Sequence, residues 1–248
     1  MRIRLLDVEF DALTVNDLHA EISEAVTARE RKIIANHNLH SIYLSHTDPQ
    51  MRKFFCMVDK VHIDGMPLVY LARFFGYKVQ RQHRVTYVDW VRPLMSVCAQ
   101  QGWKVFYLGG RPGVAGFAAQ RLQKVYPSLK IETHHGYFTK TNYENLRVLE
   151  IIHSFNPHIL MVGMGMPLQE RWIAENLNQI NATVILTAGA CFDYIAETLP
   201  TPPRWMGQIG LEWLYRLISE PKRLWKRYLL EPWYILGLVV KEFIHPKS

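Results

Sequence analysis

An aspartate followed by a glycine, Asp64-Gly65, ends a short β-rich run at residues 60–65 and precedes a helical pattern at 67–75. A carboxylate at the end of a strand can act as a general base that takes the proton from an attacking hydroxyl group. It can equally form an Asx turn or cap the N-terminus of the following helix. The spacing alone leaves both interpretations open.

A second set of polar groups follows another β-rich run, in the segment GMGMPLQERW (163–172). Gly165 and Pro167 favour a tight turn, after which Gln169 and Glu170 would stand at the start of a helix. An amide side chain offers both a donor and an acceptor, which suits the edge of a uracil or a sugar hydroxyl. Ordinary turn and capping chemistry is the alternative, since an acid in the first helical turn is favourable.

A glycine-rich loop, YLGGRPGVAG (107–116), lies between a predicted strand and a predicted helix. Gly109 and Gly110 would let backbone N–H groups approach a phosphate at the N-terminus of that helix. With Glu132 near the end of the next strand, the pattern resembles the dinucleotide-binding fingerprint. It therefore suggests a competing function, an NAD-dependent oxidoreductase.

The segment 210–235, GLEWLYRLISEPKRLWKRYLLEPWYI, is basic and aromatic. On a helix, Lys222, Arg223, Lys226 and Arg227 would lie on one broad face. Arginines can hold a diphosphate through paired hydrogen bonds, and the tryptophans and tyrosines are typical of a membrane interface. The alternative is a solvated basic face that packs its aromatic residues on the core.

These groups need a scaffold that brings several strand ends together, and the order of predicted elements supplies one. Most β-rich runs are continuously apolar, which is typical of strands buried on both faces of a parallel sheet. Alternation with helix-length segments such as 113–126 and 142–155 predicts an α/β fold with a doubly wound, mostly parallel sheet, whose ligands bind beyond the carboxyl ends of the strands. The β-rich runs are 2–10, 32–38, 60–65, 104–110, 130–138, 158–165 and 183–189.

Composition and charge set the broad limits. The 248 residues are 49% hydrophobic and carry a formal charge of +7, so we expect a filled core and an anionic partner: a nucleic acid, a phosphorylated metabolite or a membrane. The run TPPRW (201–205) divides a core at 1–200 from a helical appendage at 201–248. Because a spanning helix needs about 20 apolar residues, a soluble or peripheral protein is expected. The three scattered cysteines suggest neither disulfides nor a zinc site.

Taken in order, the motifs resemble the WecG/TagA/CpsF glycosyltransferases over about residues 5–230. The order and spacing of GxPxQE and LEWLYRL make the resemblance specific. The segments that carry it are Asn38, Asp64-Gly65, RVTYVD (84–89), FYLGG (106–110), GMGMPLQE (163–170), the Gly189–Asp193 turn and GLEWLYRL (210–217).

The resemblance implies a Rossmann-like core, a C-terminal appendage that closes the site and favours the membrane, and no obligatory metal or other cofactor. It implies inverting transfer of a sugar from a UDP-sugar to an undecaprenyl-diphosphate-linked sugar, in polysaccharide assembly at the cytoplasmic face of the cell membrane. Asp64 matches the base. The predicted substrate-binding residues are Asn36, Asn38, Arg84, Asp89, Gly109, Gly110, Gly165, Pro167, Gln169, Glu170, Gly189 and Asp193, with Arg216, Arg223 and Arg227 as the diphosphate-binding arginines.

Some positions depart from the family pattern and bear on specificity. Asn36 stands where some members have Thr, and Tyr87 replaces a usual Gly. Glu197 and Thr201 replace a usual Gly and Arg before the PPxW segment. The ending RYLLEPWYIL is similar to the exopolysaccharide branch, so we expect a hexosyl donor such as UDP-glucose. A UDP-ManNAc or UDP-ManNAcA transferase of teichoic-acid or common-antigen type is the alternative.

Two other functions stay open at this point. An NAD-dependent oxidoreductase would leave RVTYVD, GMGMPLQE and the appendage unexplained. A peripheral membrane scaffold would bind vesicles through the appendage and have no nucleotide site. Nucleic-acid binding is disfavoured, because the tail contains no recognisable nucleic-acid-binding module.

Overall fold

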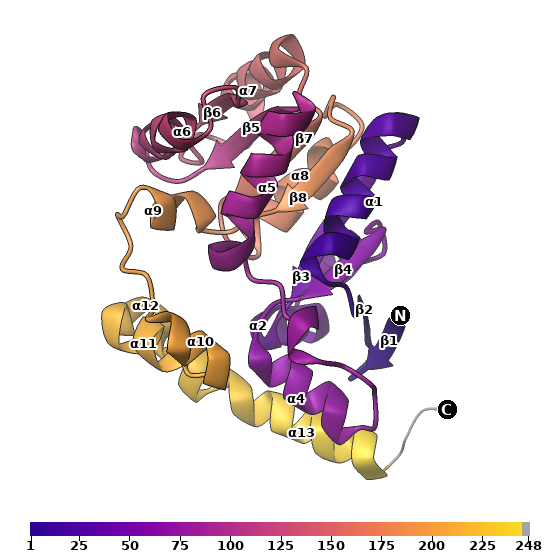
Figure 1. Cartoon of the computed structure of the whole chain (residues 1–248). Helices are drawn as coiled ribbons and strands as arrows, with labels where there is room; N and C mark the ends of the chain where they lie inside the picture. Colours follow the sequence, from indigo (N-terminus) through magenta and orange to yellow (C-terminus); the bar gives the residue numbers. More distant parts are fainter. Residues whose placement is uncertain (245–248) are drawn as a thin grey trace.

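The computed structural model describes residues 1–244, except for the side chains of Arg204 and Gln208. One sheet of eight strands forms its centre, in the order β1-β2-β4-β3-β8-β7-β5-β6 (Figure 1). The strands are β1 (Arg2–Leu5), β2 (Val8–Asp11), β3 (Lys32–His37), β4 (Lys60–Ile63), β5 (Lys104–Gly109), β6 (Lys130–His134), β7 (Ile159–Gly163) and β8 (Val184–Thr187). Every pair except β1 and β2 is parallel, which confirms the predicted mostly parallel sheet.

Helices cover both faces of the sheet, as a doubly wound fold requires. Along β5, Val105 and Tyr107 pack on one side, while Phe106 and Leu108 pack on the other. One face is covered by α1 (Val15–Ala28), α5 (Tyr87–Gln101), α6 (Val114–Val125) and α9 (Cys191–Ile195). The opposite face is covered by α2 (Leu39–Thr47), α3 (Pro49–Phe55), α4 (Met66–Phe74), α7 (Asn142–Phe155) and α8 (Leu168–Asn176); a 3-10 turn, η1 (Arg81–His83), precedes α5.

The first strand prediction, a single run over 2–10, is wrong. Residues 2–11 form an antiparallel hairpin instead, with Arg2 paired to Asp11 and Leu5 to Val8. Its two turn residues, Leu6 and Asp7, have φ angles of 51° and 57°. Two successive left-handed residues make the tight turn that suits hairpins, yet no glycine or asparagine signals it in the sequence.

Gly109 and Gly163 lie where neighbouring strands end too close together for any side chain. A Cβ on Gly109 would lie 2.2 Å from the carbonyl oxygen of Gly163. A Cβ on Gly163 would lie 2.1 Å from the hydroxyl of Tyr107 and 2.4 Å from the carbonyl oxygen of Gly189. These glycines are therefore required by packing between β5, β7 and the turn after β8, independently of any ligand.

The appendage folds as α10 (Arg204–Ile209), α11 (Glu212–Ser219), α12 (Pro221–Leu229) and α13 (Glu231–Ile244), and the basic residues Lys222, Arg223, Lys226 and Arg227 all lie on α12. Pro221 and Pro232 each stand in the first turn of a new helix. Backbone N–H groups in the first turn have no partner within the helix, so the missing N–H of proline costs no hydrogen bond there. The predicted appendage also includes 245–248, which lie outside the described residues.

The last helix returns to the core. It contacts α2, runs beneath α4 and buries Ile235 (Figure 1). Within residues 1–244, no helix combines the length and apolar character needed to cross a membrane. The appendage thus forms a layer of short helices over the carboxyl ends of β3 and β4.

Candidate active site

Asp64 lies at the carboxyl end of β4, beside the end of β3. The register pairs His37 with Ile63, so Asn36, Asn38 and Asp64 come together at one edge of the sheet. One oxygen of the Asp64 carboxylate, Oδ2, accepts from Nδ2 of Asn36 at 3.3 Å and from Nδ2 of Asn38 at 3.2 Å. Thr187 donates to the Asn36 amide oxygen at 3.1 Å, which turns the amide nitrogen toward the carboxylate. Two amides therefore fix the orientation of this carboxylate.

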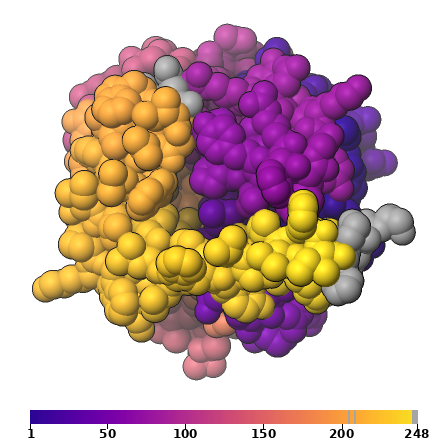
Figure 2. All heavy atoms as spheres, turned by 90° about the horizontal axis from the view of Figure 1, so that it is seen from below, coloured from indigo at the N-terminus to yellow at the C-terminus, as the bar shows by residue number. Residues whose placement is uncertain are grey.

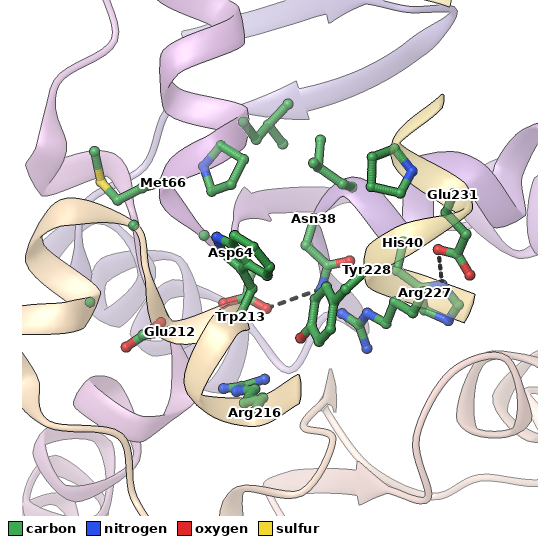
Figure 3. A pocket seen from close by; sticks show the side chains of 17 residues that line it. Asn38, His40, Asp64, Met66, Glu212, Trp213, Arg216, Arg227, Tyr228 and Glu231 are labelled. Carbon is green, nitrogen blue, oxygen red and sulfur yellow. Dashed lines mark hydrogen bonds and ion pairs between the residues drawn. The ribbon is translucent and has the colours of Figure 1, made fainter. Parts of the chain in front are cut away.

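Asp64 does not cap the N-terminus of α4, which was the alternative interpretation. The N-cap of α4 is Gly65, and no side chain makes a capping hydrogen bond there. The carboxylate instead lines a cavity of about 390 Å³ between the core and the appendage (Figure 3).

Two arginines from the appendage face this cavity, Arg216 on α11 and Arg227 on α12. Neither forms an ion pair with any described carboxylate, and the buried Nε of each has no hydrogen-bond partner. Burial, which disfavours the charged form, lowers the pKa of Arg227. Buried cations without a partner are costly, so an anion in the cavity would stabilise them.

A second cavity, of about 980 Å³, lies at the ends of β5, β7 and β8. It contains Gly110, Gly165, Asp193 and Arg223 of the predicted site. Arg223 is 63% exposed and pairs with Glu220 at 2.6 Å. The three predicted diphosphate-binding arginines are thus divided between two cavities.

Arg216 lines the Asp64 cavity and also contacts a residue that is adjacent in sequence to one in the lining of the second cavity. Its guanidinium stacks on the ring of Tyr194, 5.6 Å from the centroid. Tyr194 follows Asp193, which lines the second cavity and whose pKa is raised by burial. Arg216 therefore joins the Asp64 cavity to the helix that carries Asp193.

Gln169 and Glu170 are both 1% exposed and line neither of these cavities. The Gln169 amide oxygen accepts from the backbone N–H groups of Gly165 at 3.2 Å and Gly189 at 3.1 Å. Its amide nitrogen donates to Glu170 at 2.7 Å. The side chain joins two strand-end turns, so the geometry gives it a positioning role; direct contact with substrate stays a prediction.

The remaining predicted residues lie outside the linings of the two cavities. Arg84 has a side chain 8% exposed and pairs with Glu212 of α11 at 2.9 Å and with Asp89 at 3.4 Å. It therefore joins the core to the appendage. Gly109, Pro167 and Gly189 belong to the strand-end turns and do not line either cavity.

The carboxylate, the unpartnered arginines and the glycine-lined cavity agree with the comparison to known proteins. The profile of the glycosyl transferase WecG/TagA/CpsF family matches residues 3–248. The chain belongs to this family. The resemblance predicted from the motifs is confirmed.

Relatives of this family member include the enzymes named N-acetylglucosaminyldiphosphoundecaprenol N-acetyl-beta-D-mannosaminyltransferase of Staphylococcus aureus strains MW2 and NCTC 8325 / PS 47. Each is 24% identical over 233 residues, which are 90% of this chain and 87% of the relative. The protein is thus a glycosyltransferase related to enzymes that act on lipid-linked sugars.

Two structural details also argue against the hypothesis of an NAD-dependent oxidoreductase. Glu132, the acidic residue of the fingerprint-like pattern, lines a separate cavity with Lys104 and Arg147. Gly109 is explained by strand packing. The resemblance of the glycine-rich loop to the dinucleotide-binding fingerprint is therefore only partial.

Sequence reasoning missed several residues that line the site. His40 and Glu231 pair at 2.7 Å on the wall of the Asp64 cavity, although 191 positions separate them. Trp213 and Tyr228 line the same cavity. In the second cavity the missed cations are Arg111 and Lys140. Among these missed residues, only Arg111 could have been found from the sequence, because it directly follows Gly110 in the glycine-rich loop.

Proposed function

We propose that this glycosyltransferase moves an N-acetylmannosaminyl group from UDP-ManNAc to GlcNAc that is linked through a diphosphate to undecaprenol. The names of its relatives support the transferred sugar and the acceptor, while UDP as its carrier follows from the resemblance of the motifs. They do not support the expected UDP-glucose donor, and they agree with the teichoic-acid-type alternative instead. The family membership, which spans nearly the whole chain, supports the reaction class.

One observation supports the chemistry most strongly. A carboxylate oriented by two amides shares a cavity with two half-buried arginines, whose Nε atoms are buried and which have no acidic partner among the described residues. A general base and stabilisers of a developing anionic charge are the two components that an inverting glycosyl transfer needs. The second, more polar cavity has the glycine turns and cations that suit a nucleotide.

In the proposed mechanism, Asp64 takes the proton from the acceptor hydroxyl as the hydroxyl oxygen attacks the anomeric carbon. The bond from that carbon to UDP breaks, and UDP leaves with the electron pair. Arg216, which lines the Asp64 cavity and contacts Tyr194, neutralises the charge that grows on the leaving diphosphate. The proposal includes no metal cofactor, because the guanidinium groups supply the positive charge.

The proposal also places the enzyme at the inner face of the cell membrane. Large aromatic side chains are exposed on the appendage, among them Trp205, Trp225 and Trp233. Exposed basic residues Lys222 and Lys226 accompany them on α12. Amphipathic aromatics and cations together favour binding to an anionic bilayer surface.

The substitution Asp64→Asn tests the base. We expect kcat with purified lipid acceptor to fall by about 10²- to 10⁴-fold, because the amide cannot accept the proton. UDP affinity, measured by calorimetry, should stay within a few-fold, since Asp64 does not line the second cavity. Asp7→Asn is the matched control, because Asp7 is exposed in the hairpin turn between β1 and β2 and asparagine tolerates its left-handed conformation.

Near-normal turnover by Asp64→Asn would show that Asp64 is not the base. The same assay with UDP-glucose in place of UDP-ManNAc tests the donor. Faster transfer from UDP-glucose would contradict the proposed sugar while leaving the role of Asp64 intact.

A further inference from the structure

The Asp64 cavity is lined by polar and aromatic side chains as well as by apolar ones (Figure 3). The rings of Trp213 and Tyr228 face it from the appendage, with centroids 6.0 Å apart and an interplanar angle of 50°. The polar groups on the opposite walls include Asn38, Asp64, His40 and Glu231. Aromatic faces beside converging hydrogen-bonding groups suit a sugar ring, which has C–H groups on its faces and hydroxyl groups on its rim.

His40 has one ring nitrogen engaged and one left over. Its Nδ1 lies 2.7 Å from Oε2 of Glu231, and the two side chains are 17% and 13% exposed, so this hydrogen bond is largely shielded from water. Because a carboxylate accepts and cannot donate, Nδ1 carries the hydrogen of this bond. Among the described residues, none makes a hydrogen bond to Nε2. Nε2 is therefore the nitrogen that a ligand in the cavity can use.

Packing between the core and the appendage fixes this ring. His40 stands in the first turn of α2, two residues after Asn38, which donates to the carboxylate of the base. Glu231 is the first residue of α13, which packs on α2 and brings the ring of Tyr234 to 5.3 Å from that of Tyr43. Figure 2 shows the yellow α13 along one side of the hollow between the purple part of the core and the orange helices of the appendage. The orientation of the imidazole therefore depends on α13 lying on α2.

We propose that His40 is a specificity-determining residue that contacts the acceptor sugar through Nε2, and that Glu231 is the positioning residue that fixes its ring. The partner is a hydroxyl group other than the attacking one, because Asp64 accepts from the attacking hydroxyl. A hydroxyl can donate and accept, so it matches Nε2 in either protonation state of the imidazole. This inference rests on the proposed function and deepens it: recognition of the acceptor sugar is complete only when α13 lies on the core.

The first test uses the wild-type enzyme with UDP-ManNAc, a soluble GlcNAc diphosphate that bears a short alkyl chain, and analogues of this acceptor that each lack one ring hydroxyl. The analogue without the attacking hydroxyl should give no transfer. Among the others, we expect one to lower kcat/KM by about tenfold or more, because it leaves Nε2 without its partner. If every analogue that keeps the attacking hydroxyl reacted as well as the complete acceptor, the inference would be overturned and the proposed function would stand. No transfer to the complete acceptor would overturn the proposed function itself.

The variant His40→Asn assigns the contact, because asparagine keeps a donor near the position of Nδ1 and removes Nε2. We expect kcat/KM for the complete acceptor to fall about tenfold, mainly through KM, and the sensitive analogue to react within about twofold of the complete acceptor. UDP affinity should stay at the wild-type value, since His40 does not line the second cavity, and this also shows that the variant folds.

His153→Asn is the matched control, since His153 is exposed on α7 and lines neither cavity. It should keep the wild-type preference for the complete acceptor over the sensitive analogue. If His40→Asn kept that preference too, another group would read this hydroxyl and the assignment to His40 would be wrong.

Two variants of Glu231 test the positioning role. Glu231→Gln keeps an oxygen that can accept from Nδ1, so the preference for the complete acceptor should stay within about threefold of the wild type. Glu231→Ala removes that oxygen, and the preference should fall to the level of His40→Asn. If Glu231→Ala instead lowered kcat/KM for both acceptors by the same factor, Glu231 would only hold the appendage, and the positioning role would be overturned.

Discussion

At the scale of single residues, the arginines of the site differ in whether an acid already neutralises them. Arg84 has Glu212 at 2.9 Å, and Arg223 has Glu220 at 2.6 Å. Arg216 and Arg227 have no such partner among the described residues and are the ones that share the cavity with Asp64. A cation whose charge is not yet balanced gains most from a bound anion. Arg216 and Arg227 are therefore the arginines to test.

Replacing the two arginines separately should give different kinetic effects. We expect Arg216→Ala to lower kcat by roughly 10- to 100-fold, because it removes charge stabilisation from the departing UDP. Arg227→Ala should raise the KM for the lipid acceptor by roughly tenfold or more, because it removes a contact made in the ground state. Steady-state kinetics with varied acceptor separates the two effects.

The control for this pair is Lys222→Ala on α12, since Lys222 is exposed and lines neither cavity. With a soluble acceptor its kinetics should match the wild type. If Arg216→Ala and Arg227→Ala changed the same constant by the same factor, the assignment of one arginine to each substrate would be wrong.

At the scale of elements, the site is built from turns that follow parallel strands, among them β3, β4, β5, β7 and β8. One amide, Gln169, holds the turns after β7 and β8 together through their backbone N–H groups. Its other end donates to Glu170, whose Oε2 is buried without a partner. Burial raises the pKa of Glu170 to about 7. The positioning of both glycine turns therefore depends on a carboxyl group that titrates near neutral pH.

This raised pKa predicts a pH-dependent stability. The folded state favours protonated Glu170, so its stabilising contribution is complete below the unfolded value near 4.5 and is lost as pH rises through about 7. Glu170→Gln stays neutral and lacks this dependence. From pH 5 to pH 8, the unfolding free energy of the wild type should fall relative to the variant by roughly 2 to 3 kcal/mol. Urea unfolding of both proteins across this range measures it, and parallel curves would contradict it.

Much of this scaffold follows from local patterns. Continuous apolar runs predicted the parallel strands, and parallel strands end at a common edge, which is why Asn38 and Asp64 were expected together and are found 3.2 Å apart. The hairpin at 2–11 was missed because Leu6 and Asp7 carry no turn signal. The helical character of the appendage was predicted, and Pro221 and Pro232 mark in the sequence where two of its helices begin.

The division of polar residues between ligand contact and support could not be predicted. Gln169 looks like a surface amide until the two backbone N–H groups that need its oxygen are located. The pairing of His40 with Glu231 depends on α13 returning to α2, which no local pattern encodes. Long-range contacts decide these roles, and they exist only once the chain has folded.

At the scale of the whole molecule, two side-chain pairs join the appendage to the core, in addition to the packing of α13 on α2. Arg84 pairs with Glu212 at the start of α11, and His40 pairs with Glu231 at the start of α13. Between these points α11 and α12 carry Arg216 and Arg227 over the end of the sheet. The position of both arginines therefore depends on pairs that touch neither proposed reacting group.

The Arg84–Glu212 pair tests this dependence. Both side chains are mostly buried, at 8% and 15% exposure, so Arg84→Met should leave Glu212 as an unpaired acid on the cavity wall. We expect each of Arg84→Met and Glu212→Gln to destabilise the fold, and the double variant to recover about 1 to 3 kcal/mol of the summed loss in a double-mutant cycle. Acceptor KM should rise with Arg84→Met while UDP affinity changes little, because Glu212 lies in the Asp64 cavity and not in the larger one. Additive stability losses, or equal losses of acceptor and UDP binding, would mean that this ion pair does not hold the appendage in its working position.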